Sequence, residues 1–405
     1  MPRGHREAVA AVAAAGNSLR SEMSLDFDVV VFSHLRWRWV YQRPQQLLTR
    51  LARHHQVWYV EEPVTVDSDD KWLEIENVAA NVNVVRPHLR AEYPFYLGSQ
   101  IPPLTDLAAE LMAGQGLHAH ALWLYTPMPL PVAQTLQPLA VVYDCMDELS
   151  AFRFAPPELL QREAQLLAWA DVVFTGGPSL HRAKQGRHPN VHCFPSSIDV
   201  PHFRQARDGR LADPPDQAAI PRPRLGYFGV VDERIDYGLL AALAEARPNW
   251  QVVVVGPFAK VNPDDLPHPP NIHYLGQRPY DELPAYISGW DLALMPFALN
   301  EATQFISPTK TLEYMAAGRA IVSTPIADVK EPYGDIVYVA DGPLAFIAAC
   351  DRALNQPAWE RLRRERGAEA VLAQTSWDDT ADRMHVLLDQ AVHRRLLRIP
   401  DAHTC

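Results

Sequence analysis

Hydrophobic runs alternate with amphipathic stretches along most of the chain. A run such as "FDVVVFSH" (27–34) is apolar up to its last residues, which is typical of a parallel strand that is buried on both faces. The next stretch, "RPQQLLTRLARHH" (43–55), has apolar residues at helical spacing and a proline in its first turn. Further strands are predicted at 56–63, 121–127, 140–148, 171–177 and 191–199, with a helix at 156–170. This order of elements predicts a doubly wound α/β unit.

A second series begins after a proline-rich stretch at 207–224, which we interpret as a linker. The tail, 358–397, has a helical pattern throughout. We therefore predict two Rossmann-like α/β domains that face a cleft, where ligands bind at the carboxyl ends of the strands. The second series predicts strands at 224–231, 250–257, 271–277, 291–297, 320–326 and 336–341, and helices at 236–248, 280–290 and 307–318. The predicted division is a disordered leader at 1–25, a first domain at 26–206, a linker at 207–223, a second domain at 224–375 and a helix at 376–405 that packs back on the first domain.

The composition argues against a nucleic-acid-binding protein, a membrane-spanning protein and a disulfide-linked protein. The chain has 405 residues, enough for two domains with separate cores, and its net charge of −11 argues against nucleic acid as a partner. No apolar run approaches the roughly 18–20 residues that span a bilayer, and Met23 is an alternative start within the leader. Four cysteines lie far apart without a CxxC pair, so we expect neither a disulfide framework nor a cysteine zinc site, and a reducing cytoplasm fits: Cys145, Cys193, Cys350 and Cys405.

The stretch "SPTKTLEYMAAG" (307–318) is the first candidate for chemistry. We place Ser307 at the N-cap and Pro308 at the first helical position, where free backbone N–H groups attract phosphate. Lys310 adds a positive charge, and Glu313 lies on the same face about one turn further on. A carboxylate accepts hydrogen bonds from vicinal hydroxyls, so this face suits a nucleoside diphosphate. The alternative is a surface Lys–Glu pair, which stabilises a helix by a few tenths of a kcal/mol.

Several segments, taken in order, resemble the glycosyltransferase group 1 superfamily, the retaining enzymes with the GT-B fold. The resemblance covers roughly residues 25–395 and is most specific at 300–325. It implies two Rossmann-like domains with C-terminal helices that cross back. The segments are "VVVFSHLRWRWVYQRPQQLLTRLARHHQVWYVEEP", "ADVVFTGGPSL", "FPSSIDVPHF", "GYFGVVDERID", "NIHYLGQRPYDELPAYISGWDLALMPF" and "SPTKTLEYMAAGRAIVST".

The resemblance also implies roles for residues of the second domain. Glu313 is expected to hold the ribose hydroxyls, and Lys310 to face the diphosphate. Arg234 is expected near the phosphates, although the usual Gly-Arg pair reads Gly229-Val230 here. The other implied donor-binding residues are Gly229, Ser307, Pro308 and Thr309 through their backbone, and Tyr274, Leu275 and Gly276 around the base.

Two positions depart from the pattern of this superfamily. A second Glu, common about eight residues before Glu313, is replaced by Phe305. In the first domain, Met146 stands where His is common, so a catalytic imidazole is absent at that position. Polar residues that precede Phe305 are candidates to contact the sugar instead: Asn300, Glu301 and Thr303.

The loop after the first strand, "SHLRWRWVYQRPQ" (33–45), combines basic and aromatic residues. Tryptophan stacks on the apolar faces of sugars and arginine pairs with phosphate or carboxylate, so we predict an acceptor-binding wall. The alternative is a helix start whose tryptophans fill the core. The candidate acceptor-binding residues are His34, Arg36, Trp37, Arg38, Trp39 and Arg43.

Asp144 and Asp147 follow the strand at 140–148 and are the candidate catalytic residues. Either carboxylate could act as a general base on an acceptor hydroxyl if the reaction inverts, whereas a retaining reaction needs no base. The alternatives are helix N-capping and, with less support, metal binding. Glu61 and Glu62 offer a weaker version of the same argument. We expect no metal in catalysis, because cations and a helix dipole can stabilise the leaving diphosphate.

The resemblance implies a glycosyltransferase that moves a hexose-type sugar from a nucleoside-diphosphate donor to a saccharide or lipid-linked acceptor in bacterial envelope or exopolysaccharide synthesis. Uridine diphosphate is the expected nucleotide by family frequency, and no other cofactor is expected. We expect a cytoplasmic protein, with peripheral contact at the inner membrane if the acceptor is lipid-linked. The alternatives are a sugar-nucleotide epimerase of the same fold and a non-catalytic sugar-nucleotide-binding protein. A nicotinamide oxidoreductase is disfavoured because no strand is followed by G-x-G-x-x-G.

Overall fold

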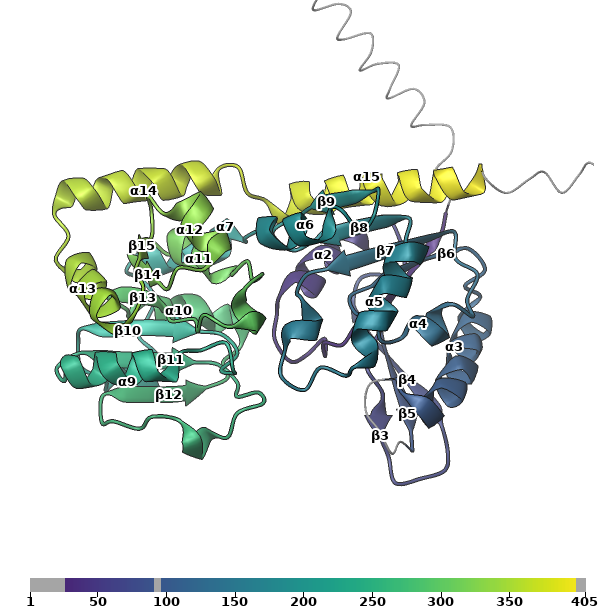
Figure 1. Cartoon of the computed structure of the whole chain (residues 1–405), viewed down its shortest axis with the longest axis horizontal. Coiled ribbons are helices and arrows are strands. Elements are labelled where there is room, and N and C mark those ends of the chain that lie inside the picture. The colour runs from purple at the N-terminus through teal and green to yellow at the C-terminus, as the bar shows by residue number, and fades with distance from the viewer. Residues whose placement is uncertain (1–25, 91–95, 398–405) are drawn as a thin grey trace, which may run out of the picture.

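The computed structural model describes residues 26–90 and 96–397. Within these ranges the chain forms two sheets, each packed against helices, that lie side by side (Figure 1). The predicted α/β class with two Rossmann-like units is thereby confirmed. The predicted leader at 1–25, which contains Met23, and Cys405 lie outside the described residues.

The first sheet is buried on both faces. Val29 and Val31 of strand β1 (Asp28–Phe32) pack in one core cluster, whereas Val30 and Phe32 pack in the cluster on the opposite face. Successive side chains of a strand point to opposite faces, so burial on both sides explains the continuous apolar run in the sequence. The parallel strands are ordered β3 (Val64–Thr65), β5 (Val82–Leu89), β2 (Val57–Val60), β1, β6 (His120–Leu124), β7 (Ala140–Cys145), β8 (Val172–Thr175) and β9 (Val191–Cys193).

The sequence pattern missed the outer part of this sheet. Strand β4 (Trp72–Ala79) pairs antiparallel with β5, and helix α3 (Ile101–Gln115) follows them. None of the β4 residues is buried, and Glu74, Glu76 and Asn77 interrupt its apolar residues, so it lacks the apolar run that marks a buried strand.

The second sheet has the strand order of a dinucleotide-binding fold. Within the described residues its parallel strands run β12 (Ile272–Gly276), β11 (Gln251–Val255), β10 (Arg224–Phe228), β13 (Leu292–Met295), β14 (Ile321–Ser323) and β15 (Tyr338–Val339). The direction of winding reverses between β10 and β13. A crevice is expected outside the carboxyl ends of the strands at such a point.

Helices connect the strands in both units. Those of the first unit are α2 (Arg43–Leu51), α3, α4 (Leu130–Ala133), α5 (Glu158–Trp169) and α6 (Pro178–Lys184). Those that follow are α7 (Val200–Arg204), which contacts α10 and α11 of the second unit, α8 (Pro215–Ala218), α9 (Tyr237–Ala246), α10 (Leu283–Ser288), α11 (Lys310–Ala316), α12 (Ala327–Tyr333), α13 (Pro343–Leu354), α14 (Ala358–Leu372) and α15 (Trp377–Leu396).

The C-terminal tail, which has a helical pattern throughout, forms two helices. The break lies between α14 and α15, where the Ser376 side chain accepts hydrogen bonds from the backbone N–H groups of Asp378 and Asp379 and so begins a new helix. Helix α14 contacts α11 of the second unit, whereas α15 lies along the first unit against α2, β7 and β8 (Figure 1). The predicted packing of the last helix on the first domain is confirmed.

The predicted linker packs closely on the second unit. Gln217 is fully buried and binds the Trp290 indole, and Ile220 joins the second core. Phe203 and Ala206, which precede the linker, also belong to that core. The boundaries at residues 206 and 223 stay a prediction, but the segment between them is packed on the second unit and is not a flexible linker.

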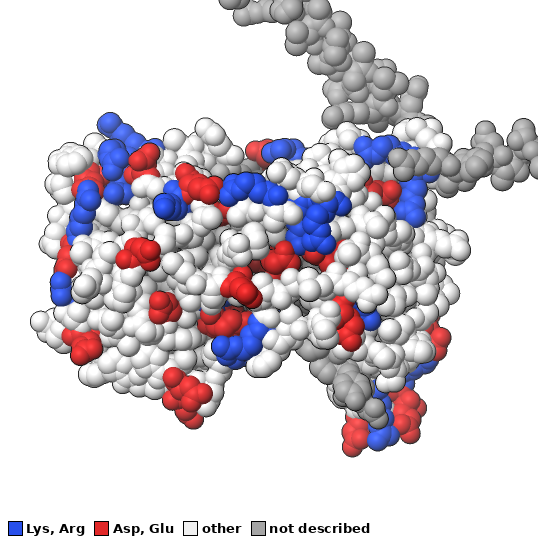
Figure 2. All heavy atoms as spheres, in the orientation of Figure 1, with Lys and Arg blue, Asp and Glu red and all other residues white. Residues whose placement is uncertain are grey.

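None of the helices in the described ranges has the length and hydropathy that a bilayer-spanning helix requires. Figure 2 shows acidic and basic side chains mixed over one face, with basic residues gathered along the edge formed by α14 and α15. Cys145, Cys193 and Cys350 carry free thiols.

Candidate active site

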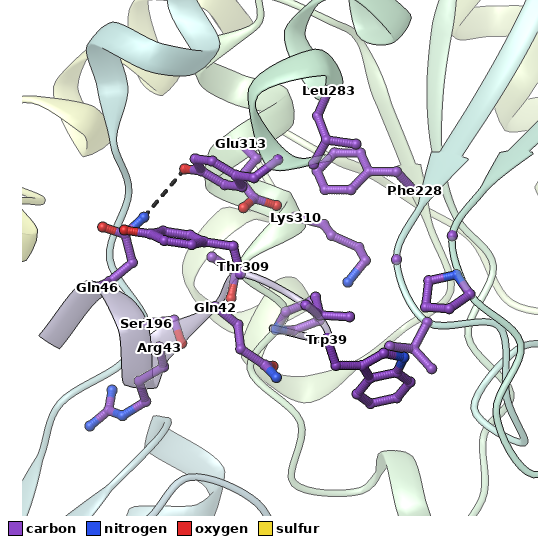
Figure 3. A pocket seen from close by; sticks show the side chains of 18 of the residues that line it. Trp39, Gln42, Arg43, Gln46, Ser196, Phe228, Leu283, Thr309, Lys310 and Glu313 are labelled. Carbon is purple, nitrogen blue, oxygen red and sulfur yellow. Dashed lines mark hydrogen bonds between the residues drawn. The ribbon is translucent and has the colours of Figure 1, made fainter. Parts of the chain in front are cut away.

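A cleft of about 790 Å³ lies between the carboxyl ends of the two sheets (Figure 3). Residues 227–230 after β10 and 306–313 around α11 form its second-domain wall. Residues 37–43 after β1, Asp147 after β7 and 196–199 after β9 line the other side. This volume falls in the range of about 300–1,000 Å³ that is typical of small-molecule sites.

Helix α11 begins later than the sequence predicts. Its N-cap is Thr309 and its first residue is Lys310, so the assignment of Ser307 to the N-cap and Pro308 to the first helical position is wrong. The Thr311 N–H donates to the Pro308 carbonyl at 3.1 Å. A tight turn with a hydrogen bond between residues three positions apart therefore leads into the helix. Ser307, Pro308 and Thr309 nevertheless line the cleft.

Contacts in its C-terminal half hold α11 in place. The Phe228 N–H donates to the Tyr314 hydroxyl at 3.0 Å, which ties the helix to β10. The Arg207 guanidinium donates to the Ala316 carbonyl at 2.6 Å, where a cation is favoured by the helix dipole. Gly318 ends the turn with φ of +68°, a left-handed conformation that glycine adopts at low cost. The buried face of α11 is therefore fixed, and its other face borders the cleft.

Lys310 and Glu313 are the charged side chains that α11 presents to the cleft (Figure 3). Among the described residues neither has a hydrogen-bond or ion-pair partner. The Lys310 ammonium lies 5.7 Å from the Tyr227 ring centroid and 5.9 Å from that of Phe228, within reach of a cation–π attraction. Burial lowers the pKa of Lys310, and burial raises the pKa of Glu313 to about 7 against the opposing effect of Lys310.

The loop after β10 brings the backbone close to Lys310. Gly229 has φ of +138°, and a side chain there would collide with the Lys310 side chain. Arg234 borders the same part of the cleft and pairs with Asp232 at 2.7 Å. The loop thus places a second cation, already balanced by one carboxylate, near Lys310.

Asp144 does not face the cleft. Its carboxylate is fully buried and receives two hydrogen bonds from the Arg43 guanidinium, at 2.8 and 3.1 Å. Arg43 also donates to the Phe194 carbonyl at 2.7 Å, and in Figure 3 its guanidinium points away from the cavity. The prediction of Asp144 as a catalytic base and of Arg43 as an acceptor ligand is therefore wrong for their charged groups, which bind each other inside the first domain.

Asp147 lines the cleft three residues later. Burial raises the pKa of its carboxyl to about 6, while Arg234 opposes this shift. No side chain in the described ranges donates a hydrogen bond to this carboxylate. A carboxylate with such a pKa, open to a substrate, can accept a proton near neutral pH.

Glu61 shapes the aromatic-basic loop instead of facing a substrate. It is almost fully buried and accepts hydrogen bonds from the Trp37 N–H at 2.7 Å and from Arg36 at 3.1 Å. Arg36 also donates to the carbonyls of Glu62 and Pro63. Arg36 and Glu61 therefore fix the loop from behind, and Arg36 does not line the cleft.

The remaining loop residues divide between the cleft and the protein interior. Trp37 and Trp39 line the cleft, and Trp37 also packs edge-on against Tyr59, so both interpretations of its role apply in part. Arg38 reaches the rim, where it pairs with Glu76. His34 lies outside the cleft lining, and burial lowers its pKa to about 4.

The residues expected around the base do not border the cleft. Tyr274 and Leu275 belong to β12 and pack on the second core, so neither borders the cleft. The residues that do border it follow the strand: Gln277, Arg278, Pro279 and Tyr280. The rule that ligands lie outside strand ends would have indicated this position. Other cleft residues that the sequence did not single out are Gln46, Ser196, Ser197 and Leu283.

The two walls touch at one rim of the cleft. The Gln46 amide donates to the Tyr280 hydroxyl at 3.3 Å, shown as the dashed line in Figure 3, and the Tyr41 and Tyr280 rings lie 4.6 Å apart. The Gln277 amide donates to the Trp39 carbonyl. These contacts join the segment after β12 to α2 and to the first loop of the other unit, and they enclose the site on that side.

Both departures from the superfamily pattern lie near this site. Met146 lines the cleft beside Asp147. Phe305 packs on a core cluster of the first domain rather than facing the cavity, which suits an apolar residue. Asn300 and Thr303 bind each other in a capping box, and neither they nor Glu301 line the cleft.

A family model and a known relative both match parts of this chain. Residues 222–356 match the model of the family described as "Glycosyl transferases group 1". The chain is also 25% identical over 295 residues to TuaH of Bacillus subtilis (strain 168), across 67% of this chain and 72% of that protein. The second unit therefore matches a group 1 glycosyltransferase domain. The name of TuaH assigns that relative provisionally to teichuronic acid biosynthesis.

Solved structures share the fold of this chain. Sucrose-phosphate synthase from Thermosynechococcus elongatus superposes with a TM-score of 0.70 at 17% identity, over 91% of this chain and 100% of that one. A trehalose-6-phosphate protein from E. coli, bound with UDP-2-fluoro glucose, gives 0.63 at 15% identity, over 90% and 99%. At such identities the likeness shows the GT-B fold alone, with the second sheet and α11 in the domain that the family model covers.

Proposed function

We propose that this enzyme transfers a hexose-type sugar from a uridine-diphosphate donor, held on the second-domain wall of the cleft, to a saccharide or lipid-linked acceptor on the first-domain wall. The observation that carries the proposal is the pair Lys310 and Glu313, which share one face of α11 toward the cavity and lack hydrogen-bond partners in the described part of the chain. Desolvated charges are costly to leave unpaired, so a ligand with complementary groups is expected.

The donor's groups match this wall in order. Lys310 and Arg234 would face the diphosphate, whose negative charge grows as the sugar leaves, and fixed cations in a dry site stabilise that charge most strongly. Glu313 would accept hydrogen bonds from the ribose hydroxyls. The base would then reach the residues after β12, where Arg278 and Tyr280 border the cleft.

The acceptor would enter against Trp39 and Asp147. An indole suits the apolar face of a sugar ring, and the Asp147 carboxylate can orient a hydroxyl or accept its proton. The relative's assignment to teichuronic acid biosynthesis supports an acceptor that belongs to a bacterial envelope polysaccharide. A lipid-linked acceptor would bring the first domain to the inner membrane face.

The first experiment is calorimetric titration of the purified protein with UDP, GDP and ADP. We expect one-to-one binding of UDP, weakened at least tenfold by Lys310→Ala and by Glu313→Ala, since a hydrogen bond to a charged group contributes about 1.5–3 kcal/mol. Lys330→Ala and Glu301→Gln are matched controls at exposed positions away from the cleft, and each should bind as the wild type does. If none of the three nucleotides binds, the donor site proposed on α11 is wrong.

A non-catalytic sugar-nucleotide-binding protein is the second candidate, because Met146 and Phe305 replace a His and a Glu that are common in the superfamily. Radiolabelled UDP-hexoses incubated with the protein separate the two functions. Release of UDP or transfer of label to an added saccharide, lost in Asp147→Asn, supports the enzyme. Tight binding with neither product over hours supports the binding protein.

A further inference from the structure

A cluster of imidazole and carboxylate groups lies where α15 meets the first domain, away from the cleft. His55 stands in the connection between α2 and β2, and His385 and Asp389 lie on α15. Each residue offers one ligand atom, and these three atoms all lie within 4.8 Å of one another. None of the three lines the cleft, so this cluster is independent of the proposed transferase site.

The environment of His55 fixes which of its nitrogens is free. Its Nδ1 lies 2.9 Å from the Phe27 carbonyl oxygen, which can only accept a hydrogen bond, so Nδ1 carries the proton. The Nε2 lone pair therefore points toward α15. Metal-binding histidines typically have this arrangement, in which the second nitrogen donates to a carbonyl that holds the ring in place.

His385 and Asp389 meet this lone pair from one face of α15. They are four residues apart, and neighbours at that spacing share a face of a helix. The His385 Nε2 lies 2.9 Å from the His55 Nε2 and 3.6 Å from the Asp389 Oδ2. Two ligands at about 2.1 Å from a tetrahedral metal ion lie about 3.4 Å apart, so the three atoms need to move little to surround one ion.

Two neutral imidazoles in this position can share one hydrogen bond without a metal, with the His385 Nε2–H donating to His55. In that arrangement the Asp389 carboxylate takes no part in the hydrogen bond between the two imidazoles. His385 can present the Nε2 lone pair to a metal ion if its proton is carried on Nδ1 instead.

We propose that His55 Nε2, His385 Nε2 and the Asp389 carboxylate bind a divalent transition metal ion of the zinc class, with water in the fourth position. Imidazole and carboxylate ligands favour such ions over magnesium, which prefers oxygen. The ion links α15 to the first domain. Because α14, which precedes α15, contacts α11 of the second domain, α14 and α15 together connect the two domains, and the ion fixes their attachment to the first one.

The test uses the full chain without a polyhistidine tag, stripped with a chelator and dialysed. Zinc chloride is titrated by calorimetry, magnesium chloride is the negative arm, and thermal unfolding is followed with and without zinc. We expect one zinc ion per chain, a higher Tm with zinc, and no effect of magnesium. Because a ligand that binds only the folded state stabilises it, the rise in Tm should grow with zinc concentration.

Variants on the more exposed side of the cluster make the test specific. His385→Gln and Asp389→Asn should each weaken zinc binding at least tenfold and remove most of the rise in Tm. His54→Gln is the matched control, because His54 stacks on His385 at 4.3 Å but contributes no ligand atom, and it should bind zinc within about threefold of the wild type. Equal zinc binding in all four proteins, or binding without any rise in Tm, would overturn the proposal and indicate adventitious surface sites.

Cobalt substitution gives a second readout. A cobalt ion in this site should show the intense visible absorption of a four-coordinate complex, and His385→Gln should lose it. The pale spectrum of a six-coordinate aqua ion in the wild type would contradict a built site.

Discussion

The two walls of the cleft carry their charges in different states. On the second-domain wall, Lys310 and Glu313 face the cavity with no hydrogen-bond or ion-pair partner in the described ranges. On the first-domain side, Arg43 is bound to Asp144, and Arg36 is bound to Glu61. The loop that looked richest in ligand-binding groups has therefore used most of them to hold its own shape.

The difference teaches that a loop's count of charged residues does not measure its capacity for ligands. What counts is whether each charge has a partner inside the protein, because a paired and buried charge has little left to offer a substrate. Asp147 is the exception on the first-domain wall: it lies three residues from Asp144, yet it borders the cleft.

The largest expected effect separates these two neighbouring carboxylates. Asp147→Asn should lower kcat by about 10²–10⁴-fold if the residue accepts a proton, with the protein folded and UDP affinity within about threefold of the wild type. The wild-type kcat/KM should fall as pH drops through about 6, where Asp147 becomes protonated. A small loss of rate with an unchanged pH profile would show that Asp147 only orients the acceptor.

A loss of stability is expected on the paired side. Arg43→Met leaves the Asp144 carboxylate buried without its partner, which should lower the free energy of unfolding by about 3–5 kcal/mol. Urea denaturation measures this, and the double variant Arg43→Met/Asp144→Leu should recover much of the loss because no charge is then left buried. If Arg43→Met keeps its stability but binds UDP or acceptor at least tenfold more weakly, Arg43 is a ligand-binding residue after all.

The smallest effect tests the unpaired side by pH. Glu313 accepts hydroxyl hydrogen bonds best when ionised, and its pKa of about 7 leaves about one tenth ionised at pH 6. UDP affinity should therefore fall up to about tenfold from pH 8 to pH 6. The UDP phosphate also changes its charge over this pH range, and this alters the UDP affinity of every variant equally. The wild type is therefore compared with Glu313→Gln, whose UDP affinity should change less between pH 8 and pH 6. Parallel pH curves for the two proteins would remove Glu313 from the donor site.

The sequence by itself determined the α/β class, most strands of the two parallel sheets and the face of α11. Buried parallel strands leave continuous apolar runs, such as β1 and β11, and a helix leaves its polar pair three residues apart at Lys310 and Glu313. These signals are local, so no tertiary information is needed to find them. Strand β4, whose apolar residues are interrupted by polar ones, left no such signal and was missed.

Only the tertiary structure decided which polar residues remain available. Arg43 and Asp144 are 101 positions apart, and Arg36 and Glu61 are 25 apart, so nothing in their local sequence indicates that they bind each other. The same holds for the cluster of His55 with His385, which joins positions 330 apart. A charge becomes a structural or a functional group according to the partners that folding brings to it, and those partners come from distant parts of the chain.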